Sequence, residues 1–416
     1  MKKAFILALL ASLNTAAFAT QTITVSVNNP LNIQRTDVPI VISLAPYGNV
    51  RSALVTIGNG QQEVPCQLDD LNQDETYDEL CFLADMGKKE KKQYTVTLYD
   101  EGEPRQYKAR VYAEMVLSNS RDKKLKKHQQ NNYIESITAR GDAAYTYNIQ
   151  HHHGVDFESE LNGIRIYFDA RQTLDLYGKF KKQLELKETQ FYTPDELKAQ
   201  GYGDDVLWVG QTFGLGAFRG WDGQQPTLLE PVRSRTQRVI SYGPLRTIVE
   251  VVDRGWQAPL LNTQQPSPIN MTLRYTQYAG HRDTDVDVLF NKDVSDYRFS
   301  TGIINVKGSE EFSDKKGIRA CWGTDYPAAD TVKWKRETVG LAVYVPQKNI
   351  VSEEKANKDN YTYVLRIDGK AMSYKVTYTS ANEEFGFHSA REWFDYLKEW
   401  KKEVEKPVVW TIKEGR

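Results

Sequence analysis

The chain has 416 residues, of which 40% are hydrophobic and 11% aromatic, enough apolar material for one large domain or two ordinary ones. Its 54 basic and 55 acidic residues leave a formal net charge of −1, so no overall field draws the protein towards nucleic acid or an anionic membrane. Composition and charge therefore exclude a partner recruited by charge alone, and they favour a globular protein with a substantial core.

The N-terminus has the pattern of a secretory signal peptide. Lys2 and Lys3 precede the apolar run AFILALLASL, and Ala17-Phe18-Ala19 fits a small-x-small cleavage site. The run is too short for a convincing transmembrane helix, and no later stretch approaches membrane length. We expect residues 1–19 to be a signal peptide, the mature protein to be secreted across the inner membrane into the periplasm, and no membrane insertion.

Residues 20–112 alternate apolar and polar side chains in short runs such as QTITVSV, RSALVTI and KQYTVTLY, which predicts a small N-terminal β-sandwich. Strand patterns then dominate residues 113–416, among them GIRIYF, DVLWVG, TQRVISY, LRTIVEVV and AMSYKVTY. We therefore expect a mainly β protein whose second domain is a large antiparallel β-sandwich, with a mutarotase-like super-sandwich as one form of it. The patterns also predict helices at 193–200 and, after a capping box of Ser389 and Glu392, at the C-terminus.

Two features of the N-terminal sandwich allow more than one reading. Asp70, Asn72, Asp74 and Asp78 have the alternating spacing of a calcium loop, but Glu75 stands where such a loop needs glycine, so a polar hairpin turn is the simpler interpretation. Cys66 and Cys81 could form a disulfide across two strands in an exported protein, although spacing alone does not establish it.

The stretch QHHHGVDFESELNGIRIYF at 150–168 contains three of the six histidines of the chain. In an extended strand His151 and His153 point to one side and could ligate a metal, but no HExxH motif is present. His152 or His153 could instead act as an acid or base, and the remaining alternative is a structural role near the core.

In NGIRIYFDA, Ile164, Ile166 and Phe168 share one face of a strand, and Arg165, Tyr167 and Asp169 share the other. A face with Arg, Tyr and Asp is predicted to meet water or line a polar cleft, where the arginine fork suits a carboxylate and the tyrosine suits sugar hydroxyls.

Other candidate residues stand apart from this stretch. The segment FGLGAFRGWDG lacks the third glycine of a nucleotide-binding fingerprint and is better interpreted as a loop that presents Arg219 and Trp221. His281 begins a predicted strand, and it is either a further catalytic ring or an exposed turn residue.

Several motifs resemble those of an exported bacterial family, a domain of unknown function found with polysaccharide-utilisation machinery. The resemblance rests on His152-His153-Gly154, Glu158-Ser159-Glu160, Arg165 to Asp169, Arg171 to Thr173 and Asp175 to Lys179, and it extends to VPCQLDDLNQDETYDELCFL, LWVGQTFGLGAF and YGPLRTIV. The family is associated with an ulvan oligosaccharide dehydratase, so the resemblance implies removal of water from a non-reducing-end uronic acid.

That chemistry suggests roles for the candidate residues. Arg165 or Arg219 would neutralise the uronate carboxylate, and Lys179 would assist it or lower the pKa of a tyrosine. The base and the acid would come from His152, His153, Tyr167 and His281. Trp208 and Trp221 would provide aromatic walls for the sugar, and Glu158 would contact the substrate. No cofactor is required, and a divalent metal at the histidines is the alternative.

Two other functions fit the same sequence. A glycoside hydrolase would need a pair of carboxylates, for which Glu158 with Glu160 or Asp169 could serve. A non-catalytic, exported oligosaccharide-binding protein would also use abundant Trp and Tyr on a sandwich, although the concentration of titratable residues around 150–179 exceeds what binding requires.

Overall fold

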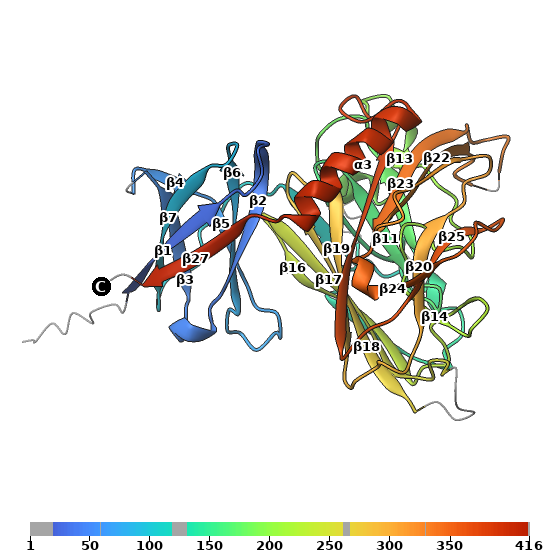
Figure 1. Ribbon diagram of the computed structural model, residues 1–416, viewed down its shortest axis with the longest axis horizontal. Helices are drawn as coiled ribbons and strands as arrows, with labels where there is room; N and C mark the ends of the chain where they lie inside the picture. Colours follow the sequence, from blue (N-terminus) through green and yellow to red (C-terminus); the bar gives the residue numbers. More distant parts are fainter. Residues whose placement is uncertain (1–19, 59, 119–130, 261–266, 329, 415–416) are drawn as a thin grey trace, which may run out of the picture.

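A computed structural model describes residues 20–58, 60–118, 131–260, 267–328 and 330–414. Figure 1 shows two bodies of antiparallel β-structure side by side, with one long helix lying across the top of the larger body. The mainly β prediction is therefore confirmed. The predicted signal peptide lies outside the described residues, and none of the described helices is long and apolar enough to cross a membrane.

The N-terminal body is a sandwich of two sheets. The first has the strand order β27 (Val409–Glu414), β1 (Thr20–Asn28), β7 (Lys91–Tyr99), β3 (Ser52–Ile57) and β4 (Gln62–Val64); the second has β2 (Arg35–Ser43), β6 (Glu79–Met86) and β5 (Cys66–Asp69). A short 3-10 helix, η1 (Ala45–Tyr47), follows β2. Alternate residues of β1, β2 and β7 are buried, and they meet in one apolar core because each strand turns its apolar face towards the opposite sheet.

The last strand of the chain returns to this first body. Strand β27 pairs antiparallel with β1, with Val409 opposite Asn28 and Glu414 opposite Ile23. In Figure 1 it runs as a red arrow beside the blue N-terminal strands. The division expected from the sequence placed residues 409–414 with the large sandwich, since strand pairing between chain ends leaves no local pattern.

The three cysteines are free thiols and all are buried, so the Cys66–Cys81 disulfide considered above does not form in this structure. In the β5–β6 pair, Cys66 lies opposite Phe82 and Gln67 lies opposite Cys81. Neighbours along a strand point to opposite faces, so the two thiols are on opposite sides of the same sheet. Burial raises the pKa of the Cys66 thiol to about 11.

The acidic segment at 70–78 is a polar turn between β5 and β6. The Asp70 carboxylate accepts hydrogen bonds from the backbone N–H groups of Gln73, Asp74 and Glu75, and Asp78 accepts one from Leu71. Glu75 has a φ of 69°, the conformation for which a calcium loop uses glycine. The carboxylates thus stabilise their own turn, which favours the hairpin interpretation.

The large body contains three sheets. One has nine strands in the order β21 (Glu310–Ser313), β22 (Ile318–Asp325), β23 (Glu337–Tyr344), β26 (Ala371–Ser380), β19 (Asp283–Phe290), β18 (Ile269–Tyr278), β17 (Arg246–Trp256), β16 (Ser234–Tyr242) and β9 (Ser136–Arg140). A second has β15 (Pro226–Thr227), β14 (Arg219–Trp221), β20 (Phe299–Ile304), β25 (Asn360–Leu365) and β24 (Ile350–Glu353), with the 3-10 helix η4 (Gln347–Asn349) before β24.

The third sheet of this body contains β10, the strand that begins directly after the three histidines at 151–153. Its strands are β13 (Asp204–Asp205), β12 (Leu174–Gly178), β11 (Gly163–Tyr167), β10 (Gly154–Ser159) and β8 (Val111–Glu114). Ile164 and Ile166 of β11 are buried in the same apolar core as Val249 and Leu273 of the nine-stranded sheet. The predicted core face of GIRIYF is therefore confirmed, and the opposite, polar face of this sheet is left to be covered by other segments.

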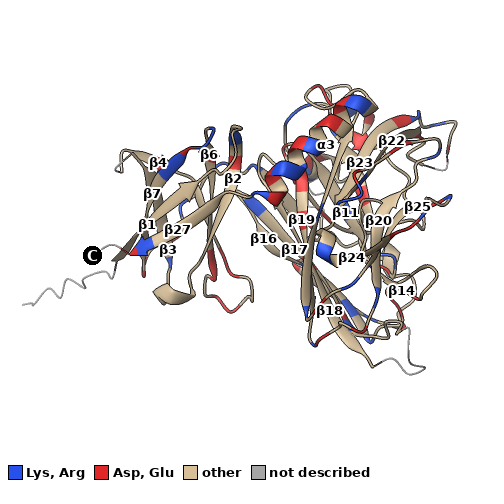
Figure 2. Cartoon of the chain, viewed as in Figure 1, with Lys and Arg blue, Asp and Glu red and all other residues tan. Residues whose placement is uncertain are grey.

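A buried polar contact joins the two bodies. Arg246, 3% exposed, donates to Asp69 (Nε–Oδ2, 2.8 Å) and to Glu79 (Nη2–Oε2, 2.7 Å), while the Gln67 amide bonds the backbone of Arg246 and the hydroxyl of Ser241. Because these charged groups would lose their partners on separation, the contact fixes the orientation of the N-terminal sandwich. Elsewhere, basic and acidic residues are interspersed over both bodies (Figure 2), as the near-zero net charge suggests.

The C-terminal helix, α3 (Ala390–Glu405), forms as its sequence predicts. The Ser389 hydroxyl accepts a hydrogen bond from the Glu392 N–H at 3.3 Å, and the Glu392 carboxylate reaches back to the N–H of His388. Trp393, Leu397 and Trp400 form the buried stripe, which packs on β22 and β23 of the nine-stranded sheet.

Two local predictions need correction. The helix expected at 193–200 is only the four-residue α2 (Asp195–Lys198), preceded by another short helix, α1 (Leu186–Thr189). The strand expected in DVLWVG ends after Asp205, and Val206 and Leu207 are buried outside any strand. The first segment belongs to the long connection between β12 and β13, and the second follows β13, so both take their shape from packing on the neighbouring sheet and not from a local pattern.

Candidate active site

A row of charged residues crosses the polar face of the third sheet. The strand register places Asp156 of β10 opposite Glu114 of β8 on one side and opposite Arg165 of β11 on the other, and Arg165 in turn opposite Asp175 of β12. Directly opposed residues project from the same face of a sheet. All four side chains are at most 4% exposed, so this charged row is buried rather than solvated.

The connection between β12 and β13 covers this face. Phe191, fully buried, lies 4.2 Å from the Arg165 guanidinium, and the Tyr192 hydroxyl accepts a hydrogen bond from Arg165 Nη1 at 2.9 Å. The expectation of an open polar cleft at Arg165 and Tyr167 is therefore wrong, because a segment more than twenty residues further along the chain closes over them.

The Arg165 guanidinium is paired with two carboxylates, those of Asp175 and Asp205. It donates to Asp175 at 2.7 Å and to Asp205 at 3.1 Å, and the Tyr167 hydroxyl donates to the same Asp175 oxygen at 2.5 Å. Burial alone would lower the pKa of Arg165, but the charges of Asp175 and Asp205 raise it. This guanidinium holds the sheet and its cover together, and the expected role of binding a substrate carboxylate would require one of these pairs to open.

His152 lies between two buried carboxylates at the end of the row. Its Nε2 is 3.1 Å from Glu114 Oε1, and its Nδ1 is 3.4 Å from Asp156 Oδ2. The Tyr112 hydroxyl donates to the other oxygen of Glu114 at 2.5 Å. Burial, with the charges of Glu114 and Glu158, raises the pKa of Asp156 well above its usual value. His152 is fully buried and does not reach the surface.

His153, the next residue, is turned outward by an unusual backbone conformation. Its φ is 67°, the left-handed region that histidine adopts only occasionally. Its ring stacks on Tyr147 with 3.8 Å between centroids, and its Nδ1 lies 2.9 Å from the Tyr147 carbonyl oxygen. Burial lowers the pKa of His153, although the hydrogen bond to Tyr147 opposes this. The ring is thus fixed in position and favours its neutral form.

Around His153 the rings and an arginine form a partly exposed surface, which we name the His153 surface: Tyr147, His151, His153, Tyr167, Arg171 and Tyr192. Tyr192 is 42% exposed and meets the His153 ring edge-on at 6.5 Å. The Arg171 guanidinium lies 4.9 Å from the Tyr147 ring and 4.8 Å from the Tyr167 ring, and it is paired with Asp169. Next to Arg171 is a hollow of about 310 Å³ that Asp169, Gln211 and Thr146 also line.

Lys179 and Glu158 lie elsewhere, in the interior. Lys179 Nζ contacts Glu158 Oε2 at 2.5 Å and donates to the carbonyl oxygens of Ser159 and Gln183, and both side chains are fully buried. The Glu158 carboxylate also accepts from the N–H groups of Glu185 and Leu186. All their bonding capacity is used by the scaffold, so the expected contacts with substrate are not available.

His281 is also separate from the His153 surface. Its Nε2 lies 2.8 Å from the Asp37 carbonyl oxygen and its Nδ1 lies 3.2 Å from Asp283, at the contact between the two bodies. Its carbonyl accepts from Ser159, at the far end of β10, six residues or about 20 Å along a strand from His153. The expected catalytic role is therefore not supported by its position.

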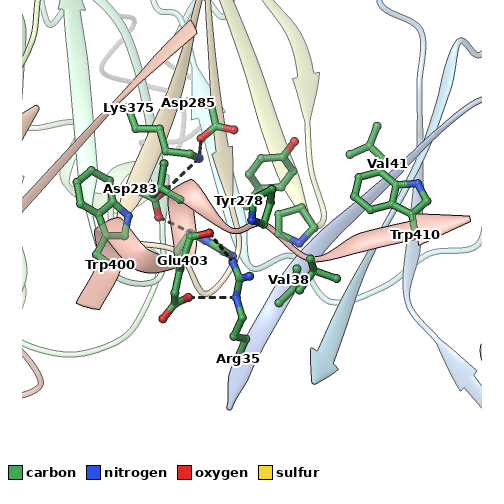
Figure 3. Close-up of a pocket in the computed structure, with 15 residues that line it drawn as sticks. Arg35, Val38, Val41, Tyr278, Asp283, Asp285, Lys375, Trp400, Glu403 and Trp410 are labelled. Atoms are coloured by element: carbon green, nitrogen blue, oxygen red, sulfur yellow. Dashed lines mark hydrogen bonds and ion pairs between the residues drawn. The ribbon is translucent and has the colours of Figure 1, made fainter. Parts of the chain in front are cut away.

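His281 lines a cavity of about 320 Å³ between the N-terminal sandwich, the nine-stranded sheet and α3. Figure 3 shows its charged residues turned towards one another: Arg35 contacts Glu403 at 3.3 Å, and Lys375 lies between Asp283 and Asp285. Since these charges satisfy each other, the cavity is primarily part of the contact between the bodies.

The remaining candidate residues differ in how much of their side chain is exposed to solvent. Arg219 is 4% exposed and donates to the carbonyl oxygens of Gln211 and Thr212 and to the Thr173 hydroxyl, which anchors the loop; burial lowers its pKa to about 10. Trp221 is 8% exposed within β14 and is not available as a sugar platform. Trp208, by contrast, is 56% exposed and remains a candidate for that role.

Sequence reasoning named His152, His153, Arg165 and Tyr167, which the structure brings together. It missed Glu114, Tyr147, Tyr192 and Arg171 as parts of the same cluster. Arg171 stands in the Arg-Gln-Thr motif, so that motif was the available signal; Tyr147 and Tyr192 carry none, because they reach the site only through the packing of loops.

The fold and site define a mainly β protein of two sandwiches, with a buried charged row beneath a surface of histidine, tyrosine and arginine. The chain belongs to the family described as "Domain of unknown function (DUF4861)", which matches residues 27–409. The family membership expected from the motifs is confirmed to this extent. A comparison with curated protein sequences finds no match.

Solved structures with a partial likeness include two from Enterococcus faecalis. One is a protein in glycosyl hydrolase family 38 (10% identity, TM-score 0.49), and the other is an alpha-mannosidase from strain V583 (9% identity, TM-score 0.46). Each likeness covers 95% of this chain but only 47% and 46% of the other, so the chain spans about half the length of these structures.

Proposed function

We propose that the protein is an exported carbohydrate-active enzyme that eliminates water from a non-reducing-end uronic acid of an oligosaccharide. The observation that carries the proposal is the orientation of His153. A carbonyl oxygen can only accept, so the 2.9 Å contact with Tyr147 means that Nδ1 bears the proton. The lone pair is then on Nε2, which has no hydrogen-bond partner among the described residues and is available to take a proton.

The reaction needs a base for the proton on C5 and an acid for the hydroxyl on C4. In the proposed step His153 Nε2 takes the C5 proton, the C–H electrons form the C4–C5 double bond, and the C4–O bond breaks. Tyr192 is placed to protonate the departing oxygen: its own oxygen accepts from Arg165, which leaves its O–H proton free to donate outward. Water leaves, and transfer of a proton from His153 to Tyr192 restores both groups.

The C5 proton is acidic only when the neighbouring carboxylate is neutralised. Arg171 is the arginine of the His153 surface with solvent contact, its side chain being 16% exposed. Its planar fork suits a carboxylate, and the hollow beside it has the size of a small-ligand site. We assign the uronate carboxylate to Arg171, the one residue of the His153 surface that lines this hollow, so that the sugar ring extends from there towards His153 and Tyr192. Arg171 exchanges part of its contact with Asp169 for the substrate, and Trp208 is a platform for the next sugar.

Replacement of Arg171 tests this assignment. Arg171→Gln is expected to lower kcat/KM on a uronate-ended oligosaccharide by about 10²-fold, the usual effect of removing one charge-stabilising donor. A neutral oligosaccharide of the same length should bind equally well to the variant and the parent. Equal losses with both ligands would show that Arg171 only maintains the loop.

A glycoside hydrolase receives less support from the described residues. Glu158 is bonded to Lys179, and Glu160 is bonded to Arg110 and accepts from Gly280, both at the end of β10 away from His153. The carboxylate pairs considered for hydrolysis therefore do not meet at one exposed position. A binding protein remains the second candidate, since exposed Tyr192 and Trp208 would also hold a sugar.

Mass spectrometry of the products distinguishes the three functions. Uronate-ended oligosaccharides incubated with the protein should lose the mass of one water at constant chain length. Shorter chains that gain a water would indicate hydrolysis. Unchanged oligosaccharides, retained by the protein in equilibrium dialysis, would indicate a binding protein and refute the elimination.

A further inference from the structure

We propose that His152 and Asp156 ligate a divalent transition-metal cation such as Zn²⁺ beneath the His153 surface, with Glu114 as the carboxylate that orients the His152 ring. One ligand atom from each of the three lies within 4.8 Å of the others. The three residues come from β8, the turn before β10 and β10 itself, so the fold and not local sequence assembles the set. Imidazole nitrogen and carboxylate oxygen are donors that suit Zn²⁺ or Mn²⁺.

The first argument is the state of the His152 ring. Nε2 lies within hydrogen-bond distance of Glu114 Oε1, an acceptor, so the proton belongs on Nε2 and the lone pair on Nδ1. A carboxylate that orients a histidine through its second nitrogen is the usual arrangement behind a metal-bound ring. Tyr112 donates to the remaining Glu114 oxygen and fixes that carboxylate in turn.

The second argument is the unused bonding capacity at Asp156. Both of its oxygens and His152 Nδ1 are buried without a hydrogen-bond partner among the described residues. Asp156 Oδ2 and His152 Nδ1 face each other at 3.4 Å, and a lone pair opposite a carboxylate is repulsive unless a proton or a metal cation lies between them. Two ligand atoms at about 2.1 Å from a tetrahedral Zn²⁺ are separated by about 3.4 Å, so the observed separation suits a shared cation.

The third argument is charge. When both are ionised, Glu114 and Asp156 place two negative charges in the interior, and Arg165 across the sheet is already paired with Asp175 and Asp205. A divalent cation would balance these two charges, and uncompensated charges in the interior are costly. Glu114 also lines a cavity of about 510 Å³ with Tyr112 and Tyr133, so the proposed site adjoins that cavity on the Glu114 side.

Metal content and thermal unfolding of the untagged protein test the proposal. After purification, or after dialysis against chelator and addition of Zn²⁺ or Mn²⁺, the protein should hold close to one equivalent, and its Tm should rise on adding the ion and fall on removing it. Asp156→Asn and His152→Gln should lose both responses. His153→Asn, next to the set in sequence but outside it, should keep them.

Two results would overturn the metal site. One is a folded wild-type protein that holds neither ion and whose Tm is unmoved by ion or chelator, a result that needs no variant. The other is retention of the ion by Asp156→Asn, which would place it at another position. Neither result depends on the elimination reaction, because His153 and Arg171 are not ligands, so the metal site and the proposed function fail separately.

Discussion

Substitution of His153 by asparagine is expected to lower kcat on a uronate-ended oligosaccharide by about 10²- to 10⁴-fold, the contribution typical of a general base. The substitution removes the Nε2 lone pair that we assign to the C5 proton. Asparagine is the suitable replacement because it tolerates the left-handed conformation at this position, where φ is 67°. The Tm should change little, since His153 is partly exposed and packs mainly on Tyr147.

The matched control is His281→Asn, which removes an imidazole from the contact between the two bodies. Its Nε2 and Nδ1 contact the Asp37 carbonyl oxygen and Asp283, so the variant should lose some stability but retain the kcat of its folded fraction. If His153→Asn kept wild-type turnover while His281→Asn lost it, the site would lie at the contact between the bodies and not at the His153 surface.

Substitution of Lys179 by methionine is expected to destabilise the fold by about 3–5 kcal/mol, the cost of removing one partner of a buried ion pair. Both Lys179 and Glu158 are fully buried, and the lysine also satisfies the carbonyl oxygens of Ser159 and Gln183. Methionine preserves most of the side-chain volume of lysine. The loss of unfolding free energy therefore measures the cost of leaving the Glu158 charge and two backbone carbonyl groups without a partner.

Chemical denaturation measures this difference in the free energy of unfolding. The nearby Lys181 is exposed, so Lys181→Met should change it by no more than about 0.5 kcal/mol. A loss below about 1 kcal/mol for Lys179→Met would contradict the buried pair. It would also return Lys179 to the substrate-binding role that the sequence suggested.

The fold was predictable where the pattern of side chains is local. The period-two alternation of β1, β2 and β7 and the buried stripe of α3 follow directly from burial on one face. The return of β27 to β1 and the shape of the connection between β12 and β13 were not predictable in the same way. They depend on contacts between distant segments, for which a single sequence carries no period.

The candidate site, like the fold, has features that the local sequence predicts and features that depend on contacts between distant segments. His152 and His153 are adjacent in the sequence, but they differ in exposure. The positive φ at His153 turns its ring outward, while the His152 ring stays buried beneath it. The charged row of Glu114, Asp156 and Arg165 depends on the register of three strands, which no motif reveals. Lys179 was assigned to the substrate because an unpaired lysine suits a carboxylate; its partner Glu158 is twenty-one residues away in sequence.

Absorbance in the ultraviolet during incubation with uronate-ended oligosaccharides tests the elimination most directly, because the new double bond is conjugated with the carboxylate. With wild-type protein the absorbance should rise until substrate is consumed, the oligosaccharides should keep their length, and His153→Asn should give a flat trace. A flat trace from wild-type protein, with oligosaccharides that are either shortened or bound unchanged, would contradict the proposed reaction.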